Sequence, residues 1–522
     1  MISFEKDRAG CLAQYLRQAP CAPLEDLRDT LYQAYLRLKT QDPAQARLGN
    51  ALLEQAAWGP CPYSGLPAVQ LLTECADALS EKARTGLLDF LRAGRSGWLA
   101  ELERNKCNSF RLLAAVSLLG CGLLLDDQDA GAAGRAALVW MEDHLAAVDL
   151  PDEFLSPFYT ALQLAALAEI RLLPVGADCA GRAGRLEAFL WRGVLRHYQP
   201  GLTELAGPYS RGYTSELAGH FQIIMACIYR LLGQEAGFTF RDTLWDPAYS
   251  AAILPHGSLE NMRYYALYFS GFPYRCDPED LEALRRRTYP CVTVQRARTD
   301  PSRDVSIKRT VADGTPWDYP AGEVRVTLEM EKGFALGWTD REFENGMACP
   351  GVQALYRRDG AVKSFFPKLV REDRYIGEWN DYPNLGLRLN PSNFPDDGRK
   401  TVVRERDGLH LTYRPRSFCR GASAMKLDLI FASQFSPPEE IRIGSRTVER
   451  WDGQERFPLE QVTVWDGAWE FMFRPLCRRG YWKVARRNGF LNVEWVQTAE
   501  DLDSLTWELL LQVGRRKIDK AE

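Results

Sequence analysis

The sequence predicts a multidomain chain of two unlike parts: an N-terminal α/α toroid, which is an incomplete barrel of helices, followed by an antiparallel β-sandwich domain. Two observations predict this order. From residue 5 to about residue 287, apolar residues recur at spacings of three and four, the period of a helix with one buried face. After that point, β-branched and aromatic residues alternate with polar ones between short turn signals. We therefore place a helical domain at 1–287 and a sandwich domain at 288–522.

The length and composition agree with two folded domains. The chain has 522 residues, whereas a single hydrophobic core stops growing at about 250 to 300 residues. Its content of 46% hydrophobic and 26% charged residues is that of an ordinary globular protein rather than a disordered or fibrous one. We expect the whole chain to fold.

The helical part consists of successive amphipathic segments separated by breaks that contain Gly, Pro and Asp. No repeat with a fixed period is visible, so an irregular ring of helical hairpins fits better than a regular solenoid. We expect about ten to twelve helices. The clearest cover 24–38, 68–79, 110–125, 133–145, 157–172, 186–198 and 215–232.

The second part has short alternating segments joined by Asp-Gly and similar turns, which favours a large antiparallel sandwich over a parallel sheet. The predicted strands cover 289–297, 323–330, 334–339, 401–405, 409–415, 426–433, 461–467, 469–475 and 506–513. Two long aromatic loops, 344–353 and 377–398, interrupt them, and loops of that kind often carry function.

Several classes of function are disfavoured. The net charge of -4 provides no general attraction to nucleic acid, and no glycine-rich phosphate-binding motif occurs. The most apolar stretch, 110–125, is shorter than the roughly 20 residues that a membrane span needs. No paired Cys/His spacing indicates a metal site, and nothing calls for a cofactor. The first residues place charges where a secretory signal needs an apolar core, so we expect a cytoplasmic protein.

The segment 197–221 concentrates polar and titratable side chains just before an apolar helix. Its chemistry-bearing residues are His197, Tyr209, Arg211, Tyr213, Glu216 and His220. A tyrosine beside an arginine is suited to general acid or base catalysis, because the cation favours the phenolate form. The alternative is a loop whose tyrosines pack on the core and bond to the backbone. Polar density of this kind is costly to bury without partners, so we name it the first candidate site.

Two further segments carry candidates. Asn108 lies at the start of the most apolar predicted helix, where it is either an N-cap or an amide that binds a substrate carboxylate or hydroxyl. His256 stands between Pro255 and Gly257 in a predicted loop, and Arg263 follows seven residues later. Both are candidates for the same site, although a lone histidine is more often structural.

The order of a helical half, a β-sandwich half and a PYSRGY segment at 208–213 resembles the α/α-toroid plus β-sandwich polysaccharide lyases, the heparinase II/III-like and the chondroitin AC or hyaluronate lyase-like families. The resemblance spans nearly the whole chain in architecture. It implies cleavage of a uronic-acid polymer by β-elimination, and therefore an acidic oligosaccharide or polysaccharide as partner.

By residue type and order, the resemblance implies roles for particular side chains. Tyr209 and Tyr213 would be the base and acid, with His197, His220 or His256 sharing that work. Asn108 and Arg211 would neutralise the substrate carboxylate, because removing the neighbouring proton leaves enolate-like charge. Glu216 and Arg263 complete the substrate-binding set. The spacing from Asn108 to His197 is wider than in the chondroitin AC-like pattern.

Two other functions remain open at this point. A glycoside hydrolase on the same scaffold needs two carboxylates about 5 to 9.5 Å apart, and the available ones are Asp152, Glu153, Glu204 and Glu216. A non-catalytic carbohydrate-binding protein would instead use its aromatic loops to stack on sugars. The sequence does not select the sugar, the linkage or the oligomeric state.

Overall fold

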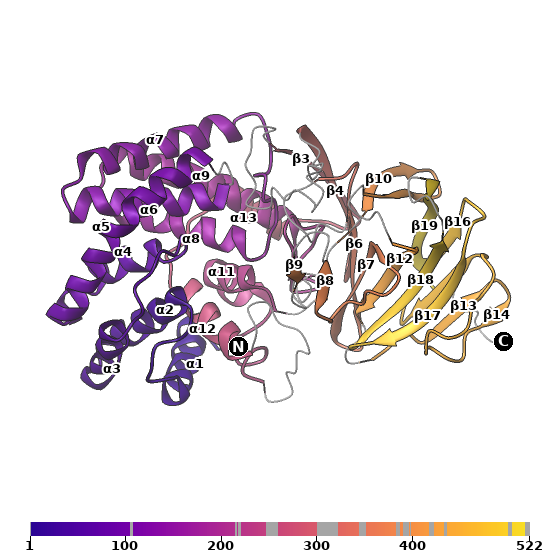
Figure 1. Ribbon diagram of the computed structural model, residues 1–522, viewed down its shortest axis with the longest axis horizontal. Coiled ribbons are helices and arrows are strands. Elements are labelled where there is room, and N and C mark those ends of the chain that lie inside the picture. The colour runs from indigo at the N-terminus through magenta and orange to yellow at the C-terminus, as the bar shows by residue number, and fades with distance from the viewer. Residues whose placement is uncertain are drawn as a thin grey trace.

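The computed structural model confirms the predicted fold class, with a helical part followed by antiparallel sheets (Figure 1). It describes residues 2–104, 108–213, 217, 221–246, 259–299, 322–343, 351–382, 387–389, 396, 398–416, 422–432, 436–498 and 504–516. The boundary between residues 287 and 288 stays a prediction. It falls between the last described helix and the first long strand, Cys291–Thr299.

Helical hairpins form the N-terminal part, an incomplete α/α toroid, as Figure 1 shows in indigo and magenta. Local signals start several helices: Ser3, Asp26, Asp42 and Asp127 each accept a hydrogen bond from a first-turn amide. The described α-helices are α1 (Phe4–Gln18), α2 (Leu27–Leu38), α3 (Pro43–Glu54), α4 (Gly65–Glu74), α5 (Glu81–Arg104), α6 (Asn108–Leu124), α7 (Gln128–Leu145), α8 (Tyr159–Leu172), α9 (Ala177–His197), α11 (Ile223–Leu232), α12 (Leu259–Phe269) and α13 (Pro278–Arg285).

The largest differences from the predicted helix starts are at α9 and α11. α9 begins nine residues earlier than predicted. The prediction missed its first two turns because they are rich in Ala, Gly and Arg, so large apolar residues do not recur there at helical spacing. α11 begins only at Ile223, later than the predicted start at residue 215. No described helix combines the length and the apolar character that crossing a bilayer requires.

The inner helices are buried on all sides rather than along one stripe. Every residue of α2 is buried, as are the first twelve residues of α8 and the first fourteen of α6. α6 packs against α5, α7 and α8, which makes it the centre of the helical core. A helix surrounded in this way needs apolar residues around its whole circumference, and this explains why α6 is the most apolar stretch of the chain.

Two large antiparallel sheets form the second part. The eight-stranded sheet has the order β17 (Tyr481–Arg487), β18 (Phe490–Thr498), β12 (Ala424–Ala432), β7 (Ala361–Arg371), β6 (Val352–Arg358), β5 (Phe334–Thr339), β4 (Gly322–Glu331) and β3 (Cys291–Thr299). The seven-stranded sheet has the order β10 (Gly398–Glu405), β11 (Gly408–Pro415), β19 (Trp507–Arg515), β16 (Trp469–Pro475), β15 (Val462–Asp466), β13 (Glu440–Ile443) and β14 (Arg446–Thr447). Two-stranded ribbons are formed by β1 (Tyr198–Gln199) with β2 (Glu204–Leu205) and by β8 (Asn380–Tyr382) with β9 (Leu387–Leu389).

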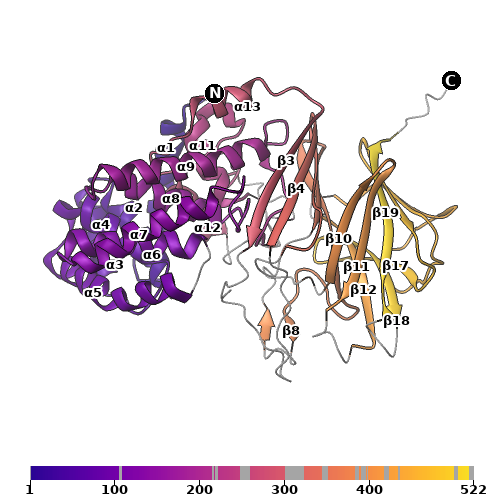
Figure 2. The same ribbon diagram turned by 90° about the horizontal axis from the view of Figure 1, so that it is seen from above.

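The eight-stranded sheet is covered on both faces. On β12, Leu427 and Leu429 point into the sandwich core shared with the seven-stranded sheet. The alternate residues Ile430 and Ala432 belong to the hydrophobic cluster that includes the helices. The sheet therefore forms a middle layer between the helical part and the outer sheet, and both views show its strands β3 and β4 next to the helical part (Figures 1 and 2).

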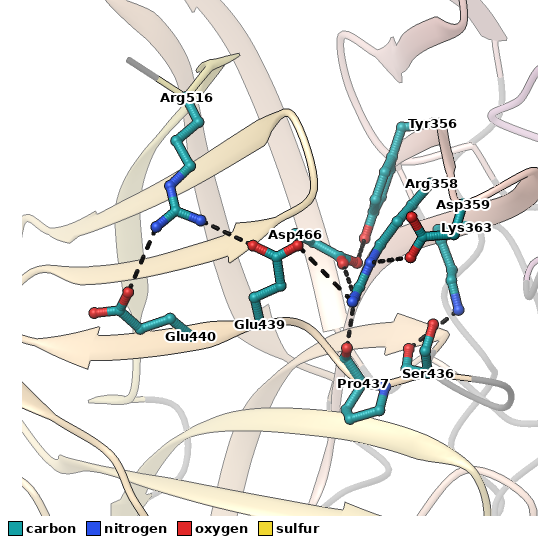
Figure 3. Close-up of polar contacts among 10 residues, drawn as sticks. All are labelled: Tyr356, Arg358, Asp359, Lys363, Ser436, Pro437, Glu439, Glu440, Asp466 and Arg516. Atoms are coloured by element: carbon teal, nitrogen blue, oxygen red, sulfur yellow. Dashed lines mark hydrogen bonds and ion pairs between the residues drawn. The ribbon is translucent and has the colours of Figure 1, made fainter. Parts of the chain in front are cut away.

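A buried polar contact joins the two sheets of the sandwich (Figure 3). Asp466 of β15 accepts a hydrogen bond from the hydroxyl of Tyr356 on β6, at 2.7 Å, and forms an ion pair with Arg358 of the same strand. Arg358 also donates to the carbonyl oxygen of Pro437 at 2.6 Å and contacts the exposed carboxylate of Asp359 at 3.2 Å. Asp466 is 1% exposed, so its carboxylate depends on these two partners in place of water.

We predict that Asp466→Ala destabilises the sandwich by about 3 kcal/mol, because it leaves the Tyr356 hydroxyl and the Arg358 guanidinium without their buried acceptor. Asp359→Asn is the matched control: its side chain is 78% exposed and touches the same guanidinium, and asparagine tolerates the positive φ of 49° at this position, so we expect a change within about 0.5 kcal/mol. Urea unfolding followed by tryptophan fluorescence measures both. Equal effects of the two variants would contradict the prediction.

Candidate active site

The loop 207–213, which carries the predicted tyrosines and arginine, is fastened to the segment that precedes α8. The Ser210 amide donates to the Phe154 carbonyl at 3.0 Å, and the Ser210 hydroxyl donates to the Asp152 carbonyl at 3.2 Å. The Ser156 hydroxyl donates in turn to the Arg211 carbonyl at 3.2 Å. Arg211 has a positive φ of 55°, an uncommon conformation for a residue with a side chain, and these bonds hold it there.

Both of these segments rest on the eight-stranded sheet. A Cβ atom on Gly337 of β5 would lie 1.9 Å from the Gly207 carbonyl oxygen, so the close approach of loop and strand requires glycine. The ring of Phe154 packs 4.9 Å from that of Phe343, which follows β5. The sheet thus sets where the loop presents its side chains.

Arg211 is the centre of the candidate site. Its Nη1 atom donates to Glu153 Oε1 at 2.6 Å and its Nη2 atom to the Tyr159 hydroxyl oxygen at 2.9 Å. The Tyr159 and Tyr213 hydroxyl oxygens lie 3.1 Å apart. Glu153 Oε2 accepts the Ser109 amide at 2.8 Å, near the N-terminus of α6. We call Glu153, Tyr159, Arg211 and Tyr213 the Arg211 cluster.

The electrostatics of the Arg211 cluster suit proton transfer. The guanidinium carbon lies 3.8 Å above the Tyr159 ring, and the guanidinium donates to the Tyr159 hydroxyl oxygen. The guanidinium therefore places positive charge beside both tyrosine hydroxyls. Glu153 is fully buried, Arg211 is 14% exposed in its side chain and Tyr213 is only partly buried, so the cluster runs from the protein interior toward solvent.

Asn108 lies beside this cluster, one residue before Ser109. Its side chain is 0% exposed, and neither its amide nitrogen nor its amide oxygen has a hydrogen-bond partner among the described residues. A buried amide without partners costs free energy, which is a common property of groups that bind a ligand. The predicted neighbours Asn108, Arg211 and Tyr213 are therefore brought together, through Ser109 and Glu153.

Tyr63 extends the cluster toward α4. Its ring packs 5.4 Å from that of Phe110, and its hydroxyl lies within electrostatic range of Tyr159 and Arg211. Burial raises the pKa of Tyr63 well above its usual value, and Tyr159 raises it further, while Arg211 acts in the opposite direction. Tyr63 therefore stays a neutral phenol that can donate a proton.

Tyr209 has a different environment from Tyr213. It is 0% exposed, and its hydroxyl donates to the Leu205 carbonyl and accepts from the Gln222 amide at 2.9 Å. A tyrosine bonded in this way to the backbone and to a buried amide supports the loop. We therefore leave Tyr209 out of the proposed catalytic set.

His197 is also held by structural partners. It is 0% exposed, its Nδ1 lies 3.1 Å from the Ala206 carbonyl and its Nε2 lies 2.9 Å from the Gln295 side chain on β3. Burial lowers the pKa of His197 to about 4, with the two hydrogen bonds acting in the opposite direction. The ring is therefore neutral near pH 7 and ties the end of α9 to the eight-stranded sheet, so we leave His197 out of the catalytic set too.

The remaining predicted site residues either lie away from the Arg211 cluster or are not among the residues that the structure describes. Arg263 of α12 donates to the Leu244 carbonyl at 2.9 Å, pairs with Glu260 at 3.7 Å and stacks at 5.6 Å on Trp245. These contacts do not include the Arg211 cluster. Glu216, His220 and His256 lie outside the described residues.

Three residues of this site were not predicted from the sequence as members of it. Glu153 was considered only as a hydrolase carboxylate, and Tyr159 and Tyr63 were not considered. A weak signal existed for each tyrosine: Tyr159 lies in the first turn of the predicted helix 157–172, and Tyr63 stands in the turn-rich WGPCPYSG segment. Within the described residues, no group of three or more His, Cys, Asp or Glu side chains could hold a metal ion.

The comparisons with known proteins were made on sequence and on structure. A family model described as a domain of unknown function (DUF8769) matches residues 109–253, a stretch that contains the whole Arg211 cluster. No curated protein matches the chain.

Among solved structures, heparinase III is similar with a TM-score of 0.37 and 8% identity, over 92% of this chain and 76% of that one. Heparan sulfate lyase HepC from Pedobacter heparinus is similar with a TM-score of 0.35 and 11% identity, over 95% of this chain and 78% of that one. At such low sequence identity, the similarity to these two proteins concerns the fold alone.

We predict that His197 makes stability depend on pH. Its pKa is about 4 when folded against 6.5 when exposed, so between these values the unfolded chain binds the extra proton. The contribution of the neutral His197 ring to the free energy of unfolding is fully present above pH 6.5. This contribution is lost as the pH falls toward 4, by about 3 kcal/mol in total. His197→Gln should flatten this part of the stability profile measured by urea unfolding, whereas His144→Gln, on α7, should leave it unchanged. A wild-type slope in the His197 variant would contradict this.

Proposed function

We propose that this chain is a polysaccharide or oligosaccharide lyase that cleaves a uronic-acid glycoside by β-elimination. The observation that carries the proposal is the Arg211 cluster, in which one guanidinium joins a buried carboxylate to a pair of tyrosine hydroxyls. The cluster combines a candidate base with a cation, and these are the two groups that elimination beside a carboxylate needs.

The proposed chemistry assigns one task to each group. The Tyr213 oxygen removes the proton from the carbon that bears the uronate carboxyl group. The electrons of that C–H bond form a carbon–carbon double bond, and the bond to the glycosidic oxygen breaks. The leaving oxygen takes a proton from a tyrosine hydroxyl, and Tyr159 resupplies that proton through its contact with Tyr213. The Asn108 amide and Arg211 stabilise the negative charge that develops on the carboxylate.

The hydrolase alternative has less support from the described carboxylates. Both oxygens of Glu153 are engaged, by Arg211 and by the Ser109 amide. Glu204 is 8% exposed in the β1–β2 ribbon, and burial raises its pKa well above the usual value. Asp152 is 1% exposed, and both of its carboxylate oxygens are buried away from solvent.

The non-catalytic alternative rests on one observation. Tyr209 has the buried, backbone-bonded environment that a binding protein without a tuned base would give it. Tyr213 does not share this environment, because its hydroxyl contacts Tyr159 and its side chain is only partly buried. A measurement of activity separates the two functions.

We predict that the protein incubated with uronic-acid oligosaccharides produces the ultraviolet absorbance of an unsaturated uronate. Tyr213→Phe should lower kcat by about 10²-fold or more, because it removes the proposed base. Tyr209→Phe is the matched control in the same loop and should keep kcat within about threefold, at a stability loss of about 1 kcal/mol. New reducing ends without absorbance would move the function to hydrolysis. Loss of activity in Tyr209→Phe but not in Tyr213→Phe would assign the base to Tyr209.

We also predict a specific need for arginine at position 211. Arg211→Lys keeps the charge, but a lysine ammonium cannot bridge Glu153 and Tyr159 with the same planar geometry, so kcat/KM should fall by about 10²-fold. Arg263→Lys, at an arginine outside the cluster, should change kcat/KM by less than about threefold. Steady-state kinetics on one oligosaccharide measures both, and similar losses would remove Arg211 from its proposed role.

A further inference from the structure

The edge strands of the two large sheets differ in how they are covered. In the eight-stranded sheet, β17 is joined by backbone hydrogen bonds to the segment 451–457. In the seven-stranded sheet, β10 is joined in the same way to the segment 340–342, and β14 has only two residues, Arg446 and Thr447, both exposed. Covered edges and very short polar edges prevent pairing with another chain.

The fourth edge strand, β3, is covered at one end only. The amides of Asp149 and Leu150 donate to the Arg296 carbonyl at 2.9 and 3.0 Å, and the Arg296 amide donates to the Asp149 carboxylate at 2.9 Å. The backbone groups of Arg296 therefore point away from β4. By the two-residue period of a strand, those of Val292 and Val294 point the same way. No described residue forms a backbone hydrogen bond with either valine at this edge.

The side chains along this open stretch are apolar. Val292 is 62% exposed and Val294 is 54% exposed. Residues on the other face of β3 contact the helical part: Gln295 bonds to His197, and Ala297 belongs to the hydrophobic cluster that includes the helices. The valines therefore lie on the face away from the helices, beside backbone groups that are open to another strand. This combination favours strand addition at the edge.

Charged side chains flank the two valines, with acids at one end and bases at the other. Glu329 of β4 pairs in register with Val292, and Glu331 follows it on the same strand. At the opposite end, Arg296 pairs in register with Arg325 of β4. The side chains of Glu331 and Arg296 are 49% and 51% exposed, although each already has an ion pair of 3.6 Å within the chain. A second copy turned by 180° thus presents the opposite charge at each end.

A two-fold axis through Thr293 fits this edge. It places Val292 of one copy opposite Val294 of the other, so that four valines form one apolar strip. Arg296 of each copy then lies beyond Cys291, the first residue of the other copy's β3, so the segment that covers Arg296 does not obstruct the pairing. The basic end of each copy also comes next to the acidic end of the other.

We propose that the open edge of β3 binds a second copy of this chain as an antiparallel strand, which gives a symmetric dimer with one continuous sheet. The paired stretch is short, so the dimer forms reversibly and its population rises with protein concentration. The proposal is independent of the lyase function, because none of its residues belongs to the Arg211 cluster.

Sedimentation velocity on the full chain tests the dimer at protein concentrations up to about 100 μM. Val294→Lys should raise the dissociation constant of the dimer by about 100-fold or more, because it places a charge inside the apolar strip on both sides of the axis. Val403→Lys is the matched control: this valine of the edge strand β10 is 55% exposed, but its backbone pairs with β11. It should change the dissociation constant by less than about threefold.

A second variant tests the register by a gain of signal. The two Thr293 residues face each other across the axis as a non-hydrogen-bonded pair, whose Cα atoms lie about 4.5 Å apart, within the range of a disulfide. Thr293→Cys should therefore give a reducible covalent dimer on mild oxidation, beyond any that the wild type forms, whereas Val403→Cys should not. A monomer at every concentration, a dimer unaffected by Val294→Lys, or no added cross-link in Thr293→Cys overturns the proposed interface.

Discussion

The eight-stranded sheet is covered on both faces, and the rest of the structure depends on this constraint. Its inner strands must satisfy two different neighbours: β12 points Leu427 and Leu429 toward the outer sheet and Ile430 and Ala432 toward the helices. On the helical side of this sheet, Lys426 and Glu494 form an ion pair at 2.7 Å with both side chains fully buried. The outer sheet packs on one face of this sheet, and the helical part packs on the other face.

The packing against this sheet explains how the loop 207–213 can hold the Arg211 cluster in a fixed geometry. The loop 207–213 contacts β5 where Gly337 leaves room for the backbone of Gly207, and Phe154 packs against Phe343 beyond the same strand. Glu153 and Arg211 therefore come from segments that are each fixed to one rigid surface. Their 2.6 Å ion pair is set by the sheet as much as by the helices, and side chains positioned this way can act without large rearrangement.

The sequence by itself determined the order of a helical part and a sandwich, because the periods of three to four and of two follow from local geometry. It also pointed to Asn108, Arg211 and Tyr213, which stand in polar stretches beside apolar helices. Only the tertiary structure decided which of their neighbours join them. Tyr209 and Tyr213 are four residues apart and look alike in sequence, yet one hydroxyl meets the Leu205 carbonyl and the other meets Tyr159. His197, Glu153 and Tyr63 received their partners from residues 9 to 98 positions away, and a contact between distant segments leaves no periodic trace in a single sequence.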